Sequence, residues 1–190
     1  MNTTEHIVEL YYRICHKNFT YTDFKVKGGN NRQFDVLAYN KKKNKLRHIE
    51  VGVTHSTCWT SELEKVKEEI GYKFFGKPKN KRPNNPKTDF NRGKTYRHQI
   101  ENAYKEFGFT WEQVIRVWCL WFHTKDKKEI SKWKKDLALE YELKPKNFEI
   151  LSFRDVVFPY LTEFVGTSNY DDEILRTISL IDQRRKQIKK

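Results

Sequence analysis

The N-terminal part of the chain shows one helical pattern of apolar positions followed by three strand-like patterns. Apolar side chains recur at helical spacing within residues 4–16. Three runs typical of strands follow at about 19–26, 33–40 and 46–54, and the turn-forming sequences KGGNN and KKKNK separate them. The pattern predicts a helix and then a three-stranded meander whose middle strand pairs with both neighbours.

The rest of the chain alternates helices with two more strands. Ser61 and Glu64 have the spacing of a capping box, which predicts a helix from there to about Phe75. Later helices are expected at about 95–107, 126–142, 154–165 and 170–188, and later strands at 113–123 and 148–153. This order predicts an α/β fold in a single domain of 190 residues, with a mixed central sheet flanked by helices and extra helices at the C-terminus.

One segment lacks any core pattern. Residues 76–97 hold three of the five prolines and eight Lys or Arg against one Asp, so we expect a basic inserted loop there. The whole chain has 38 Lys and Arg against 25 Asp and Glu, and this net charge of +13 favours a polyanion such as DNA as partner. The alternative is a solvated surface loop. The residues expected to contact nucleic acid are Lys77, Lys79, Lys81, Arg82, Lys87, Arg92, Lys94 and Arg97.

Other features of the composition narrow the class of protein. The longest apolar run, VWCLWF, is far shorter than the roughly 20 residues of a membrane span, and the first residues do not resemble a signal sequence. Cys15, Cys58 and Cys119 are far apart and lack the paired spacing of a zinc site. We therefore expect a cytoplasmic protein with reduced thiols that does not cross a membrane.

Two acidic residues interrupt the apolar pattern of the second and third predicted strands. Side chains alternate across a strand, so His48, Glu50 and Gly52 share one face, and the opposite, apolar face is expected to be the core side. If the two strands pair around the KKKNK turn, Asp35 projects on the same side of the sheet as Glu50. The sequence thus predicts two neighbouring carboxylates.

Such a pair requires something that neutralises it. Two carboxylates at close range repel each other, and Mg²⁺ is commonly held by one or two carboxylates together with waters and substrate phosphates. Structural alternatives stay open: Asp35 as a strand-end carboxylate paired with a lysine, and Glu50 in a salt bridge to Arg47 or another neighbour.

A leading helix with a Glu, a strand with Asp35, a second strand with Glu50 and then a helix together resemble the PD-(D/E)xK nucleases, the restriction-endonuclease-like superfamily. The resemblance covers residues 5–75 as a motif and the later βαβ order as an architecture. It implies a restriction-endonuclease-like αβββαβ core. It also implies that Asp35 and Glu50 bind Mg²⁺ (or Mn²⁺), with the backbone carbonyl of Val51 as a further ligand.

The chain departs from this family at Gly52, where the motif has a lysine. A lysine can arrive from the following helix, which carries Lys65, Lys67 and Lys73, and we take Lys65 as the candidate; glycine would leave room for it. Two alternatives to a relocated lysine stay open. In the first, the chain binds metal or nucleic acid but does not cleave nucleic acid. In the second, substitution of the lysine has removed the activity.

The resemblance implies a Mg²⁺-dependent endonuclease that hydrolyses DNA phosphodiester bonds. Asp35, Glu50 and Lys65 would act in its active site, with Glu9, or else Glu5, contributed by the first helix. Because many enzymes that cut both strands are two-fold dimers, we expect a homodimer by analogy. The alternatives are a non-catalytic nucleic-acid-binding protein that retains a degenerate nuclease fold, and an assembly protein whose basic surface is incidental.

Overall fold

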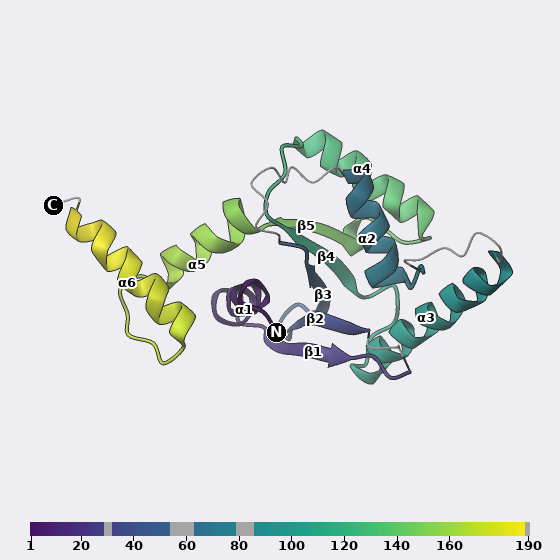
Figure 1. Cartoon of the computed structure of the whole chain (residues 1–190), viewed down its shortest axis with the longest axis horizontal. Coiled ribbons are helices and arrows are strands. Elements are labelled where there is room, and N and C mark those ends of the chain that lie inside the picture. The colour runs from purple at the N-terminus through teal and green to yellow at the C-terminus, as the bar shows by residue number, and fades with distance from the viewer. Residues whose placement is uncertain (29–31, 54–62, 79–85, 189–190) are drawn as a thin grey trace.

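A five-stranded mixed sheet forms the centre of the protein (Figure 1). The computed structural model describes residues 1–28, 32–53, 63–78 and 86–188, with the side chains of 63–65 and 86–90 excepted. The strands lie in sequence order, and the β1–β2 and β2–β3 pairs are antiparallel whereas β3–β4 and β4–β5 are parallel. They are β1 (Phe19–Lys25), β2 (Gln33–Asn40), β3 (Lys45–Val51), β4 (Ile115–Leu120) and β5 (Phe148–Ser152). The predicted meander and the predicted α/β class with a mixed sheet are confirmed.

Helices cover both faces of this sheet. Side chains of α1, α5 and α6 pack with residues of one face, and side chains of α2, α3 and α4 pack with residues of the other. In Figure 1 the hairpin of α5 and α6 extends away from the sheet. The helices are α1 (Thr3–Leu10), α2 (Leu63–Phe75), α3 (Pro86–Glu106), α4 (Lys127–Glu140), α5 (Phe158–Val165) and α6 (Glu173–Ile188). Short π-helical turns at Tyr11–Cys15 and Phe153–Val157 and a 3-10 turn at Pro145–Asn147 complete the order.

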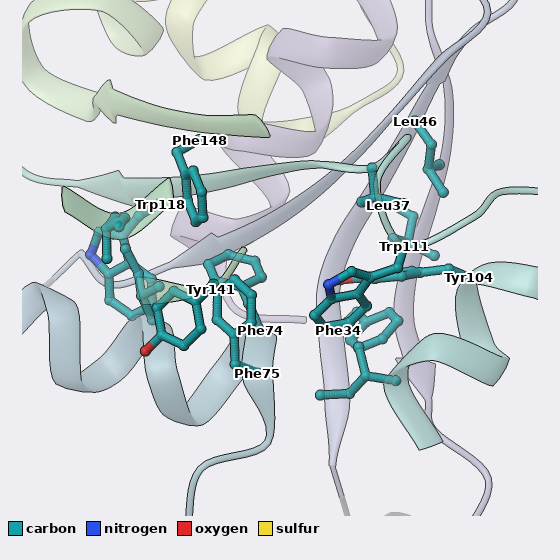
Figure 2. Close-up of a cluster of buried hydrophobic side chains, with 14 of the residues drawn as sticks. Phe34, Leu37, Leu46, Phe74, Phe75, Tyr104, Trp111, Trp118, Tyr141 and Phe148 are labelled. Atoms are coloured by element: carbon teal, nitrogen blue, oxygen red, sulfur yellow. The ribbon is translucent and has the colours of Figure 1, made fainter. Parts of the chain in front are cut away.

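Because both faces are covered, both faces of β3 are buried. Ile49 packs against the α1 and α5 side, whereas Leu46 packs on the α2 and α3 side, where His48 and Glu50 are also buried. Figure 2 shows the aromatic cluster on that second side, with Phe34, Phe74 and Trp118 among its members. The expectation that only the Ile49 face points to a core is therefore wrong. A sheet that contains parallel strands carries helices on both faces, and each face needs a core of its own.

The alternation predicted for β2 fails at its start. Val36 and Ala38 belong to the core on the α1 side, as alternation requires, but Phe34 belongs to the aromatic cluster on the opposite side. The register runs from Thr22↔Val36 directly to Phe24↔Phe34, and Asp23, the residue between, has a left-handed φ of +53°. Beyond this local distortion, side chains such as Phe34 point to the opposite side of the sheet from the one that simple alternation predicts.

The segment predicted as a basic loop is partly helical. Helix α3 begins at Pro86, so the prediction of a loop is wrong for residues 86–97, and the helix expected from 95 begins nine residues earlier. Proline suits a first helical position because its fixed φ is helical and that position needs no N–H donor. Residues 79–85 lie outside the part of the chain that the structure describes. Of the helices described, none is long and apolar enough to cross a bilayer.

Candidate active site

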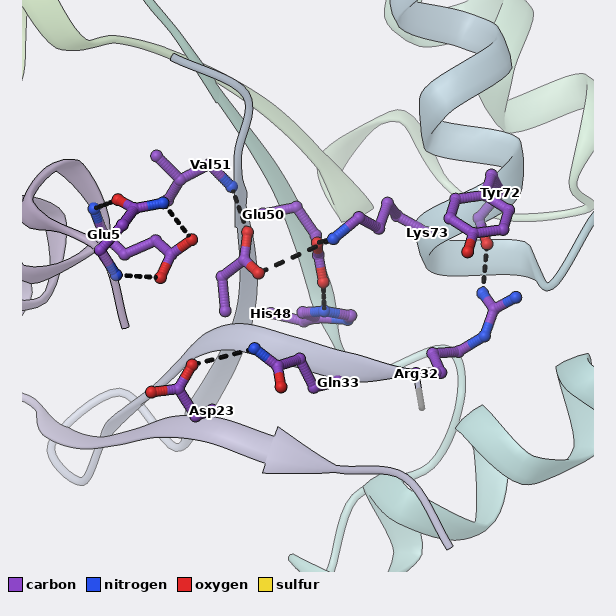
Figure 3. Close-up of polar contacts among 11 residues, drawn as sticks. Glu5, Asp23, Arg32, Gln33, His48, Glu50, Val51, Tyr72 and Lys73 are labelled. Atoms are coloured by element: carbon purple, nitrogen blue, oxygen red, sulfur yellow. Dashed lines mark hydrogen bonds and ion pairs between the residues drawn. The ribbon is translucent and has the colours of Figure 1, made fainter. Parts of the chain in front are cut away.

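Asp35 and Glu50 lie where β2 and β3 begin to separate. Val36↔Ile49 is the last registered pair of these strands, and the two carboxylates belong to the next position along each strand. Beyond that pair the Val51 N–H donates to Asp35 Oδ2 at 2.8 Å, so a side chain replaces a ladder bond (Figure 3). The Asp35 side chain is 9% exposed and that of Glu50 is fully buried.

A lysine from α2 lies against both carboxylates. Lys73 Nζ is 2.5 Å from Glu50 Oε2 and 3.7 Å from Asp35 Oδ1 (Figure 3). The neighbouring side chains Ile70 and Phe74 are buried in the aromatic cluster and hold this helix on the sheet. Lys73 therefore reaches the carboxylate pair from the last turn of a packed helix. Of the partners considered for a structural Glu50, Arg47 is excluded because it pairs with Glu149 at 3.0 Å, whereas another neighbour, Lys73, does form the ion pair. The structural alternative for Asp35, a pairing with a lysine, also agrees with the Lys73 contact.

Gly52 is required by packing against the neighbouring strand β4. A Cβ atom at this position would lie 2.6 Å from Cζ2 of Trp118, closer than side-chain carbons approach one another. Trp118 is the β4 neighbour of Glu50 in the parallel register and is itself buried. A lysine at position 52 would displace that indole. The absence of a side chain thus accommodates Trp118, whereas the sequence suggested that it left room for a relocated ammonium.

A buried histidine and tyrosine fix the second oxygen of Glu50. His48 Nε2 lies 2.7 Å from Glu50 Oε1, and His48 Nδ1 lies 2.7 Å from the hydroxyl of Tyr104 on α3. Both rings are fully buried, and His48 also packs against Phe34 with centroids 3.9 Å apart and the rings tilted. If the Tyr104 hydroxyl donates to Nδ1, Nε2 carries the proton and donates to the carboxylate. The chain Tyr104–His48–Glu50 therefore sets the orientation of Glu50.

Burial dominates the electrostatics of the site. Burial and, after it, the nearby charge of Glu50 together raise the pKa of Asp35 to about 6, against the opposing effect of Lys73. Burial also raises the pKa of Glu50 and lowers that of His48 well below its ordinary value. Burial lowers the pKa of Lys73, but the two carboxylates more than compensate and the net pKa is raised. The ammonium is therefore charged, and it offsets only part of the desolvation of the carboxylates.

The first helix does not deliver a free carboxylate. Glu9 is buried, and its Oε1 accepts hydrogen bonds from Arg13 Nε and from the Thr20 hydroxyl, each at 2.6 Å. Glu5 belongs to the exposed capping box of α1 with Asn2. Neither is brought to Asp35 and Glu50 by the contacts that the structure describes, and the place of Glu9 at a catalytic site stays a prediction.

The structure leaves two other predicted roles untested, those of the Val51 carbonyl and of Lys65. The Val51 group that contacts Asp35 is its N–H, and the expected role of its carbonyl as a metal ligand stays a prediction. Lys65 lies in α2, but its side chain is among those outside the described part, as are Ser61 and the side chain of Glu64 at the predicted helix cap.

The predicted nucleic-acid contacts fall into two groups. Lys79, Lys81 and Arg82 lie outside the described residues, as does the side chain of Lys87, which belongs to α3. The others are described. Lys77 pairs with Glu140 and lies over the Tyr141 ring, and Arg97 pairs with Glu101 at 3.1 Å. Lys94 is exposed and Arg92 is half-buried on the same helix.

The carboxylate pair provides oxygen donors of the kind that Mg²⁺ takes. Asp35 and Glu50 are hard ligands on adjacent strands, and the incomplete neutralisation of Asp35 fits a place for further positive charge. An ion held by both carboxylates requires that the Lys73 ammonium shift. Across the described ranges, no group of three or more His, Cys, Asp and Glu is arranged to hold a metal ion, so further ligands would come from backbone, water or substrate.

Sequence reasoning missed the residues that support the site. His48 shares the strand face of Glu50, which was a usable signal for their contact. Lys73 belongs to the helix that was expected to supply the lysine, and it directly precedes Phe74, which is buried against the sheet. No local pattern could have identified Tyr104, which is 56 residues away from His48. Comparison of the chain with family models, with curated proteins and with solved structures gives no match.

Proposed function

We propose that this protein is a Mg²⁺-dependent DNA endonuclease with a restriction-endonuclease-like core, in which Lys73 takes the place of the lysine that the PD-(D/E)xK motif has at position 52. The observation that carries the proposal is the contact of the Lys73 ammonium with both Asp35 and Glu50. An acid on each of two adjacent strands and a lysine beside them are the three elements of that motif, and here the lysine comes from α2. The basic chain, with its charge of +13, supports a polyanionic substrate.

Each residue has a distinct role in this proposal. Asp35 and Glu50 would hold Mg²⁺, which when bound neutralises charge on the scissile phosphate and assists departure of the leaving oxygen. Lys73 orients the attacking water and stabilises the negative charge that develops on the phosphate. His48 and Tyr104 hold Glu50 in place, because a ligand whose far side is hydrogen-bonded keeps its orientation.

Plasmid nicking in the presence of Mg²⁺ tests the proposal. We expect Glu50→Gln and Lys73→Met each to lower the nicking rate about 100-fold or more, because each removes a group that stabilises the transition state. Lys65→Met separates the two lysine candidates, and we expect it to nick at the parent rate. Lys135→Met, an exposed position on α4, controls for the loss of one positive charge.

Parent-like nicking by both Glu50→Gln and Lys73→Met would exclude this site as the catalytic centre. A low rate in Lys65→Met with a parent-like rate in Lys73→Met would instead restore the sequence-based candidate. For cleavage of both strands we propose a homodimer, and sedimentation of the protein with and without DNA measures it.

One observation favours the alternative of a non-catalytic nucleic-acid-binding protein. The ion pair of Lys73 and Glu50 already satisfies the buried charge of Glu50 without a metal. Under that alternative the protein binds DNA with a steep dependence on salt but never nicks it, in Mg²⁺ or in Mn²⁺.

A further inference from the structure

An aromatic pocket lies on the edge strand β1, away from the carboxylate pair. It has a volume of about 420 Å³, within the range of small-ligand sites. Five aromatic rings line it, with Leu37 and Leu46 among the other lining residues. The rings are those of Phe19, Tyr21, Tyr39, Phe107 and Phe109. We call this feature the aromatic pocket.

Two of these rings are unusually exposed. Phe19 is 67% exposed and Tyr21 is 54% exposed, although aromatic side chains of this size normally bury most of their surface. They are two residues apart on β1, and their register partners on β2 are Tyr39 and Leu37, so all four side chains gather on one side of the sheet. Tyr21 makes T-shaped contacts with Phe107 and Phe24, at centroid distances of 6.1 and 5.6 Å, and still keeps more than half of its surface exposed. Much of the surface of Phe19 and Tyr21 is thus available to a flat ligand.

Positive charge borders the aromatic pocket. Asn44, which lines it, belongs to the turn between β2 and β3, and the same turn and its flank carry Lys41, Lys42, Lys43 and Lys45. All four lysines are exposed, and none has an ion-pair partner within the described portion of the chain. Aromatic faces beside a row of free ammonium groups match a single-stranded nucleic acid, whose bases stack on rings while its phosphates attract cations.

We propose that the aromatic pocket binds an unpaired base of a single-stranded DNA segment, with the lysines of the β2–β3 turn on the neighbouring phosphates. The proposal rests on the proposed function in one respect, which is that nucleic acid is the partner, and it narrows the substrate to DNA with an unpaired segment. Bases inside a duplex are stacked on each other and do not present a free face to a protein ring. A second copy of the chain fits less well, because it would bring the same positive charge against these lysines.

The position of the aromatic pocket relates it to the carboxylate pair. Tyr39 and Asp35 are four residues apart on β2, which is roughly 13 Å along the strand. Leu37 of the pocket is the register partner of His48, which contacts Glu50. A single-stranded segment of several nucleotides, the usual length of such binding sites, is long enough to occupy both places.

Binding without cleavage tests this proposal. The parent protein in EDTA is titrated into a fluorescent single strand of about 15 nucleotides and, separately, into the duplex of the same sequence, and the anisotropy is followed. We expect Phe19→Ala and Tyr21→Ala to weaken single-strand binding about 5- to 100-fold, with little effect on the duplex. Phe19→Trp should retain the affinity. Phe164→Ala, an exposed aromatic on α5, is the matched control and should bind like the parent.

The salt dependence separates the rings from the lysines. Phe19→Ala should leave the slope of log affinity against log salt unchanged, whereas Lys41→Ala with Lys43→Ala should reduce it by about 0.7 for each phosphate that no longer binds an ammonium group. Single-strand binding by Phe19→Ala within about twofold of the parent, or an equal weakening on the duplex, overturns the proposal. So does sedimentation that shows Phe19→Ala converting a dimer to a monomer.

These outcomes are independent of nicking. A parent that fails to nick in Mg²⁺ while Phe19→Ala weakens single-strand binding removes the endonuclease proposal and keeps the aromatic pocket. A parent that nicks in Mg²⁺ while Phe19→Ala binds single strands like the parent keeps the endonuclease proposal and removes the proposal for the aromatic pocket.

Discussion

Asp35→Asn should make the protein more stable at neutral and alkaline pH while abolishing any Mg²⁺-dependent nicking. The substitution keeps the size of the side chain and an oxygen that can accept the Val51 N–H, but it removes a negative charge that burial and Glu50 disfavour. The pKa of Asp35 rises in the fold from an ordinary value of 3.8 to about 6. A difference of about two units corresponds to about 3 kcal/mol.

The sign of this effect depends on pH. Because the folded pKa is raised, the fold binds the proton more tightly than the unfolded chain does, and the acid form of Asp35 carries no penalty below about pH 4. As pH rises through the interval between the two pKa values, stability falls, and above about pH 6 the full cost of about 3 kcal/mol is present. An asparagine has no such cost. The advantage of Asp35→Asn should therefore grow from near zero at pH 4 to about 3 kcal/mol at pH 8.

Urea denaturation of the parent and of Asp35→Asn at pH 4, 6 and 8 measures the difference. Titration of groups remote from Asp35 cancels when the two chains are compared at one pH. Asp136→Asn, at an exposed position on α4, should change the free energy of unfolding by less than about 0.5 kcal/mol at every pH. The reasoning is refuted if Asp35→Asn is less stable than the parent at pH 8, or if its advantage is the same at pH 4 and pH 8.

Three other substitutions probe the surroundings of the site, each by urea denaturation. Gly52→Ala should cost about 1–3 kcal/mol because its Cβ meets the Trp118 ring, and Trp118→Phe in the same chain should reduce that loss; an unaffected Gly52→Ala would contradict the packing. Tyr104→Phe leaves His48 Nδ1 unpaired whichever group donates, so we expect a loss of about 1–3 kcal/mol, and no loss would mean that the hydrogen bond contributes nothing. Lys73→Met leaves two buried carboxylates without their cation and should cost about 3–5 kcal/mol at pH 8. At pH 5 that cost should be smaller, because the raised pKa values let the carboxyl groups take up protons, and equal losses at both pH values would count against the ion pair.

The carboxylate pair and the aromatic pocket share one property, which is that each carries a cost to the folded protein. The buried carboxylates carry a stability cost that a purely structural pair would not need, and such costs concentrate where a protein performs chemistry. The exposed rings of Phe19 and Tyr21 carry a similar cost, because apolar surface on an edge strand also invites unwanted association.

Local sequence patterns predicted all five strands, most of the helices and the proximity of the two carboxylates, but they missed the first part of α3. Period-two and period-3.6 patterns report how one segment divides between core and solvent, so the meander, the strand β4 and the proximity of Asp35 to Glu50 could be predicted locally. The patterns were least informative where both faces are buried. In β3 the face with His48 and Glu50 looked polar, although helices cover it.

The remaining contacts come from long-range packing, because contacts between distant segments depend on how the helices pack on the sheet. This packing brought Lys73 to the carboxylates and set the indole of Trp118 against Gly52. It also joined Tyr104 to His48 across 56 residues. A glycine that reads as a missing catalytic lysine is thus a packing requirement of the neighbouring strand, and the cation comes from the helix above it.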